Sequence, residues 1–248
     1  DALARIGGAA VPAVRSLLAT SRTPAVRQQA LWTLARIDTD AARDAVRTGL
    51  VDADAGVRHT ACHVAGLHRD RGALEPLGSI AVGDAPPVAR AAAEALGRID
   101  RPEAVPHLLG AALRADAAGD RALDHSILYA LIETAAPAPL REALATGDPE
   151  ARRAALMALD QMADRLPEPA LEAGDVLPLC DAAEPRLREA AWWVASHHPE
   201  WSSALAEKVP GMLERMAVAG AMNGERTLIG ETLAPLAAYV AVAGALGA

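Results

Sequence analysis

The stretch Val88–Ile99, VARAAAEALGRI, decides how the rest of the chain is interpreted. With Val88 counted as position 0, its small or apolar residues fall at positions 0, 4, 5, 8 and 11. Steps of about 100° per residue bring these positions onto one broad face of a helix. Similar patterns occupy Val26–Ile37 and Val57–His68. The pattern therefore predicts an amphipathic helix that recurs along the chain.

Position 8 fixes the period of this repeat. Its occupants are Leu3, Leu34, Ala65 and Leu96, spaced by 31 residues, followed less regularly by Leu131, Leu159 and Ala195. Each of these helices follows another apolar segment, often with Pro in the first turn, where the missing N–H has no partner to lose. The sequence predicts an all-α solenoid of about seven helix pairs that starts within a repeat, as a piece of a longer protein would.

The composition agrees with an all-helical chain. Hydrophobic residues make up 52% of it, yet aromatic residues make up only 2% and Phe is absent. A core of Ala, Leu and Val suits thin layers of closely packed helices. The net charge of −8 gives no overall attraction for phosphate backbones, so we expect no nucleic acid as a partner.

The motif at Val88–Ile99 resembles HEAT and HEAT-like repeats, and the resemblance extends over roughly residues 1–216. Such repeats occur in scaffolds, lyases and enzyme subunits, so they imply the fold and leave the function open. Segments Asp120–Glu133, Ala155–Met162 and Trp192–Trp201 are similar to the HEAT region of large secreted bacterial proteins that resemble sugar dehydrogenases. Those proteins also carry a β-propeller and a c-type haem domain. This narrower resemblance implies a non-catalytic middle segment in the periplasm or outside the cell, with the cytoplasm left open.

Positions 2 and 6 of the repeat lie opposite the apolar face. In HEAT-like arrays this side of the second helix lines a concave surface, so the resemblance implies a groove. Its candidate residues are Trp32, His63, Glu94, Tyr129, Met157 and Trp193 at position 6, with Arg90, His125 and Arg153 at position 2. Trp and Tyr are frequent anchors at interfaces, which favours a partner-binding groove. The alternative is that the rings fold over neighbouring repeats and add packing.

Candidate chemistry is sparse. His59 and His63, four residues apart, are weak candidates for metal ligands, but two solvated histidines in the groove are the preferred explanation, and Cys62 beside them belongs to the core face. His125 follows Asp124 without a nucleophile nearby. The run His197–Glu200 is expected to end a helix before its Pro, and the chain lacks the His-Glu pairs of HEAT-like metal hydroxylases. We therefore expect no cofactor and no catalysis.

The predicted function is a non-enzymatic scaffold whose concave face binds a protein partner or a neighbouring domain. The alternative is an enzyme that uses the same groove, either a DNA glycosylase or a bilin lyase of the HEAT-like type. Arg36, Arg90, Arg98 and Arg153 together with Glu94 keep the glycosylase hypothesis open.

Two further expectations concern the turns and the C-terminus. A polar residue stands four positions before the Arg of position 1 in the pairs Thr23/Arg27, Asp54/Arg58, Asp148/Arg152 and Glu184/Arg188. These residues are predicted to be helix N-caps, and the acid–Arg pairs to form a ladder between turns. Residues 217–248 are rich in Gly and Ala, and we expect a C-terminal cap there rather than a membrane span.

Overall fold

The structure, a computed structural model, describes residues 2–166, 170–208 and 211. Every regular element in this part of the chain is helical. The chain divides into two compact units, Asp1–Pro139 and Leu140–Ala248, which we call unit 1 and unit 2. The all-α solenoid predicted from the sequence is confirmed, and α1 with six following helix pairs lies in the described residues.

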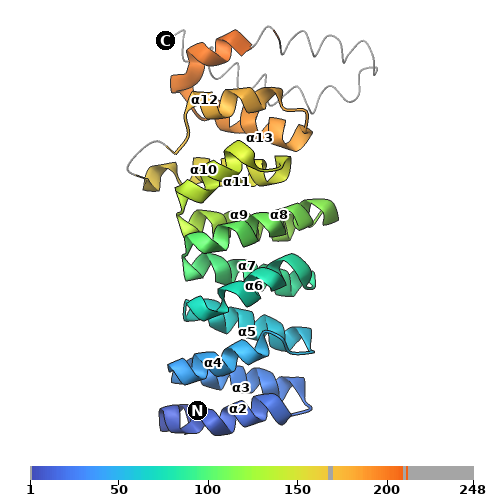
Figure 1. Cartoon of the computed structure of the whole chain (residues 1–248), viewed down its shortest axis with the longest axis vertical. Coiled ribbons are helices and arrows are strands. Elements are labelled where there is room, and N and C mark those ends of the chain that lie inside the picture. The colour runs from blue at the N-terminus through green and yellow to red at the C-terminus, as the bar shows by residue number, and fades with distance from the viewer. Residues whose placement is uncertain (1, 167–169, 209–210, 212–248) are drawn as a thin grey trace. The chain divides into compact units, whose positions relative to one another are not determined.

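In unit 1 the helix pairs stack one on the next in chain order (Figure 1). The helices are α1 (Ala2–Ile6), α2 (Val11–Thr20), α3 (Pro24–Ile37), α4 (Asp40–Gly49), α5 (Ala55–Leu67), α6 (Leu74–Gly83), α7 (Pro86–Ile99), α8 (Val105–Ala118) and α9 (Arg121–Thr134). Short 3-10 helices η1 (Gly7–Ala10), η2 (Arg71–Ala73) and η3 (Pro102–Ala104) precede α2, α6 and α8. The odd-numbered helices from α3 onward carry the repeat motif and are the second helices of their pairs.

Unit 2 contains two further pairs. Its elements are α10 (Pro137–Thr146, whose first three residues belong to unit 1), α11 (Pro149–Gln161), η4 (Ala163–Arg165), α12 (Ala173–Val176), η5 (Leu177–Asp181), α13 (Pro185–Ser196) and η6 (Pro199–Trp201). The first helix of the last pair is thus a single α-turn followed by a 3-10 helix. The expected cap at residues 217–248 lies outside the described residues.

Position 8 of the motif is the centre of the core in both units. Its described side chains, Leu34, Ala65, Leu96, Leu131, Leu159 and Ala195, are all at most 1% exposed. The frame therefore holds even where the spacing in the sequence is irregular.

Small residues let neighbouring second helices approach closely in unit 1. A Cβ placed on Gly66 of α5 would lie 2.8 Å from the Cα of Ala95 on α7, and one on Gly97 would lie 2.8 Å from the Cα of Ala130 on α9. Both contacts are with backbone, which cannot turn aside as a flexible side chain can. An Ala-rich core is thus the direct requirement of helices packed at this distance.

The second helices of unit 1 also end in one conformation. Position 12, the residue after each helix or its cap, has a positive φ at Asp38 (44°), Arg69 (48°), Asp100 (57°) and Ala135 (44°). This left-handed conformation ends the helix and turns the chain toward the next pair. Asp tolerates it through its short polar side chain, whereas Arg and Ala adopt it at a steric cost.

The predicted caps are partly confirmed. Asp54 accepts from the backbone N–H of Val57, Asp148 from those of Glu150 and Ala151, and Glu184 from that of Arg186. Thr23 is the N-cap residue of α3, as predicted, but its side chain makes no capping hydrogen bond there.

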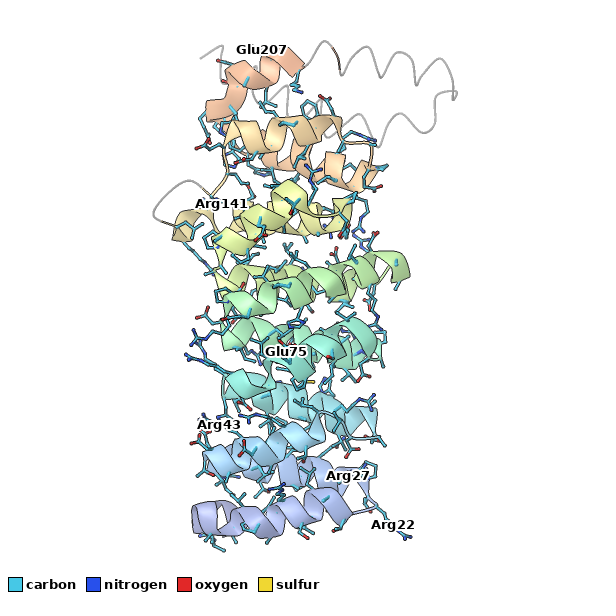
Figure 2. The ribbon with its side chains drawn as sticks, in the orientation of Figure 1. Arg22, Arg27, Arg43, Glu75, Arg141 and Glu207 are labelled. Atoms are coloured by element: carbon cyan, nitrogen blue, oxygen red, sulfur yellow. The ribbon has the colours of Figure 1, made fainter. Side chains whose placement is uncertain are left out.

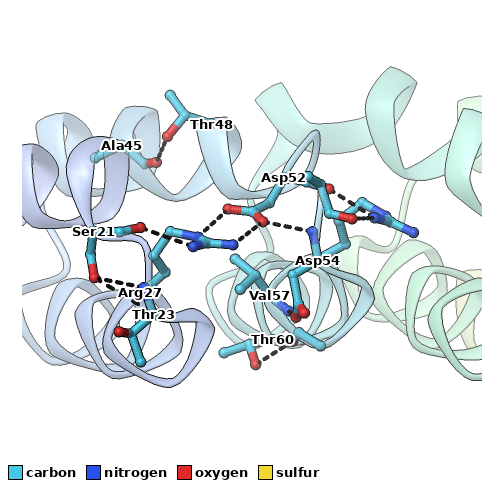
Figure 3. A network of polar contacts seen from close by, with 12 residues as sticks. Ser21, Thr23, Arg27, Ala45, Thr48, Asp52, Asp54, Val57 and Thr60 are labelled. Carbon is cyan, nitrogen blue, oxygen red and sulfur yellow. Dashed lines mark hydrogen bonds and ion pairs between the residues drawn. The ribbon is translucent and has the colours of Figure 1, made fainter.

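A ladder of Arg and Asp residues does connect the turns of unit 1, but its partners differ from those expected (Figure 3). Arg27 donates to both carboxylate oxygens of Asp52 at 2.7 and 2.8 Å, and Arg58 does the same to Asp84 at 2.6 and 2.7 Å. Each Arg also donates to a backbone carbonyl of its own turn, that of Ser21 or Asp52. These two rungs join the pair α2/α3 to the pair α4/α5, and the pair α4/α5 to the pair α6/α7.

The two edges of unit 1 carry different ion pairs. Figure 2 shows Arg27 and Arg43 on opposite edges of this unit. Arg43 lies at the edge where one pair connects to the next, and it contacts Asp38 at 2.8 Å. On the same edge Arg47 binds both oxygens of Asp70, which is only 4% exposed.

Candidate functional site

The candidate residues of unit 1 lie on its second helices, on the side away from the core. Trp32 on α3 is 40% exposed and Tyr129 on α9 is 58% exposed. His63 on α5 and Glu94 on α7 lie between them in the repeat and are half-buried. We call this surface of α3, α5, α7 and α9 the second-helix face of unit 1.

Part of the Trp32 ring packs against a neighbouring repeat. Its ring meets the imidazole of His63 edge-on, with centroids 5.6 Å apart and planes inclined by 62°. This contact joins neighbouring repeats, as the packing interpretation requires. Because two fifths of the Trp32 side chain stays exposed, the ring also offers apolar surface to a partner. Tyr129 remains more open than Trp32.

The charged members of this face are loosely paired. Arg90 on α7 lies 3.8 Å from the carboxylate of Asp120, and Arg98 lies 4.0 Å from Glu94 on the same helix. Partly exposed pairs at these distances contribute little to stability, typically under about 1 kcal/mol. Their side chains can therefore be redirected at little cost in free energy. His125 on α9 is exposed.

In unit 2 the candidates have more internal partners. Trp193 on α13 is 38% exposed, and its ring lies 4.3 Å from that of His197. Met157 on α11 is half-buried. Arg153 is held by Glu150, a carboxylate only 8% exposed, at 2.5 to 2.8 Å. Arg153 is therefore anchored within α11 and is a poor candidate for contacting a partner.

The weak metal candidates do not gain a third ligand. His59 is exposed and His63 half-buried on α5, while Cys62 is fully buried, and burial raises the pKa of its thiol to about 12. Nowhere in the described residues do three His, Cys, Asp or Glu side chains gather closely enough to hold a metal ion. Within the same residues no helix has the length and apolarity needed to cross a membrane.

One polar cluster was not found from the sequence. His198 follows α13 and contacts Asp160 of α11 and Glu200 of η6, with the ring of Trp201 stacked on it. The sequence indicated only that a helix ends before Pro199, which is confirmed because α13 ends at Ser196. The contact with Asp160 spans 38 residues, so no local spacing could reveal it.

Comparison with known proteins supports the repeat and leaves the function open. The family model of HEAT repeats matches residues 44–127. No curated protein matches the chain significantly. Among solved structures, human deoxyhypusine hydroxylase in complex with glycerol is similar at 17% identity and a TM-score of 0.35, over 93% of this chain and 96% of that one.

A second similar structure is an engineered protein, with 18% identity and a TM-score of 0.44 over 94% of this chain and 72% of that one. Likenesses at this level carry no argument about activity. The segment from α4 to α9 therefore matches HEAT repeats, within a chain whose fold is an all-α solenoid.

Proposed function

We propose that the chain is a non-enzymatic scaffold that binds a protein partner, or a neighbouring domain of the same polypeptide, through the second-helix face of unit 1. The observation that carries this proposal is the exposure of Trp32 and Tyr129 at the same repeat position on α3 and α9. Large rings that stay accessible next to Arg and His side chains are typical anchors for a partner. The neighbouring-domain form of the proposal rests on the resemblance to multidomain secreted bacterial proteins.

The long ion-pair distances of Arg90 and Arg98 support the same binding surface. Arg90 and Arg98 make only long contacts with carboxylates, so a partner would gain their hydrogen bonds without first breaking strong ones. Within the described residues of unit 2, Trp193 supplies an exposed indole ring. The proposal therefore concerns unit 1 first, and the contribution of unit 2 is tested separately.

The test is affinity capture from an extract of the source organism, with wild type, Trp32→Ala/Tyr129→Ala and Trp193→Ala as baits. Circular dichroism first establishes that all baits have equal helicity. We expect the double variant to lose a partner that the wild type retains, with binding weakened at least tenfold, because buried aromatic anchors each contribute about 2 kcal/mol or more.

The matched control removes exposed apolar side chains from first helices instead. Leu17→Ala/Leu113→Ala truncates residues of α2 and α8 that are 45% and 43% exposed, close to the value for Trp32. The control should retain the partner. If the control and the Trp32/Tyr129 variant lose the same proteins, or neither loses any, the second-helix face is not the binding surface.

A further inference from the structure

His198 connects three elements of unit 2 at the end of α13. Its Nε2 lies 3.1 Å from Oδ1 of Asp160 on α11, and its Nδ1 lies 2.6 Å from Oε1 of Glu200 on η6. The Trp201 ring stacks on the imidazole, with centroids 3.9 Å apart and planes inclined by only 6°. The side chains of His198 and Asp160 are 20% and 8% exposed. The imidazole is thus held on both edges and on one face.

This geometry defines the protonation state that suits the site. Ionised carboxylates only accept hydrogen bonds, so both ring nitrogens must donate, and only the imidazolium carries a proton on each. The second oxygen of Asp160 accepts from the Gln161 side chain at 3.0 Å, so that carboxylate is oriented from both sides. Burial is the largest single effect on the pKa of Glu200 and raises it, but the hydrogen bond from His198, a backbone hydrogen bond and the charge of His198 together leave that pKa lowered.

We propose that His198 is a proton-controlled clamp between the second helices of unit 2. As an imidazolium it donates to Asp160 and Glu200 and fixes the end of α13 to the end of α11. When it loses one proton, one nitrogen presents a lone pair to a carboxylate, and that contact becomes repulsive. Among the described residues, Asp160 and Glu200 are the charged groups with which the ring forms ion pairs. The neighbouring His197 directs its Nδ1 to the carbonyl of Trp193 at 2.8 Å.

His68 of unit 1 is the counterpart of His198, but its surroundings suit the neutral imidazole. His68 occupies the same repeat position, eleven after the first residue of the motif, and its Nδ1 lies 3.2 Å from Asp38. Its Nε2 is buried and has no hydrogen-bond partner among the described residues. Asp70 and Arg43 line the same small hollow as His68 without bonding this nitrogen. A second proton on His68 would therefore be buried without an acceptor, so this site suits the neutral ring.

The direct test is NMR of the full chain with ¹⁵N-labelled histidine. At pH 7 both ring nitrogens of His198 should show the shifts of protonated nitrogen, whereas His68 should show one protonated nitrogen and one bare one. Asp160→Asn should move His198 toward the neutral form at the same pH. A neutral His198 at pH 7, or a titration that matches that of exposed His125, would overturn the proposal.

The second test compares thermal midpoints of wild type and His198→Gln from pH 5.5 to 8.5. The charged ring makes both hydrogen bonds, so its stabilisation is complete below about pH 6.5, where histidine in an unfolded chain becomes charged, and is lost as the pH rises. The variant should melt lower by about 2 to 4 °C at pH 6 and approach the wild type at pH 8.5. His68→Gln is the control, and its deficit should not shrink as the pH rises. A pH-independent deficit in His198→Gln would contradict the clamp.

Discussion

At the scale of single residues, the Arg ladder of unit 1 consists of bidentate pairs between Arg and Asp. Arg58 makes two hydrogen bonds to the carboxylate of Asp84 and two more to the carbonyls of Asp52 and Ala53. The hydrogen bonds from Arg58 are the main cause that lowers the pKa of Asp84, against the opposing effect of burial. A bidentate pair of this kind is stronger than an exposed ion pair.

Asp84→Asn should therefore lower the free energy of unfolding by about 1 to 3 kcal/mol at pH 7. Because the pKa of Asp84 is lowered in the folded state, its stabilisation is present above the unfolded pKa and is lost as the pH falls through the folded one. The gap between wild type and variant, measured by urea unfolding, should be constant above about pH 5 and narrow below pH 4.

Asp44→Asn provides the control for this substitution. Asp44 also bonds an Arg, with 2.7 Å to Arg47, but its side chain is 63% exposed. The same chemical change there should cost under about 0.5 kcal/mol. Equal losses in the two variants would mean that the pairing between Arg58 and Asp84 contributes nothing beyond a surface contact.

The ladder also shows what the sequence could and could not predict at this scale. The sequence predicted Asp54 both as an N-cap and as the partner of Arg58, and only its role as the N-cap of α5 is confirmed. The true partner lies 26 residues away, in the turn of the next pair. Local spacing predicts contacts within a helix, whereas this contact depends on how far one repeat is displaced from the next.

At the scale of helices, the sequence predicted the structure more accurately than at the scale of single contacts. The spacing of the buried positions is set within each helix, so local sequence shows it. Position 8 is buried in every described helix that carries the motif, including Leu131 and Leu159 after irregular spacings. The outward direction of Trp32 and Tyr129 follows from the same frame. The contacts of these rings do not follow from the frame, because the edge-on contact of Trp32 with His63 depends on the packing between α3 and α5.

Gly66→Ala tests the close approach of α5 and α7. The added methyl would lie 2.8 Å from the Cα of Ala95, so the helices must move apart. Overpacking of this kind costs about 1 to 3 kcal/mol, more than the helix propensity that Ala gains over Gly. We expect a lower free energy of unfolding by chemical denaturation.

Gly110→Ala is the matched control on α8. Its new methyl would meet only the Val82 side chain at 3.5 Å, an ordinary contact. This variant should be more stable than the wild type by about 0.5 to 1 kcal/mol, from helix propensity alone. If both substitutions stabilise the protein, α5 and α7 are not packed as closely as Gly66 and Ala95 indicate.

At the scale of the whole molecule, the division into two units has a consequence for folding. The sequence predicted one array over residues 1–216, because periodicity shows the repeats and carries no information on how they group into compact units. In a repeat protein each pair contacts its neighbours, so stability is a sum of pair and interface terms. A fragment that ends at the edge of unit 1 should keep all the interfaces of that unit.

We therefore expect a fragment of residues 1–136, which contains α1 to α9, to fold on its own with a cooperative thermal transition followed by circular dichroism. A fragment of residues 1–119 lacks α9 and uncovers the side of α7 on which Gly97 meets Ala130. It should melt at a lower temperature and with less helix per residue, because one complete interface between second helices is gone. If instead the 1–136 fragment shows no cooperative transition, unit 1 depends on residues beyond it, and the division at Pro139 does not mark an independently folding unit.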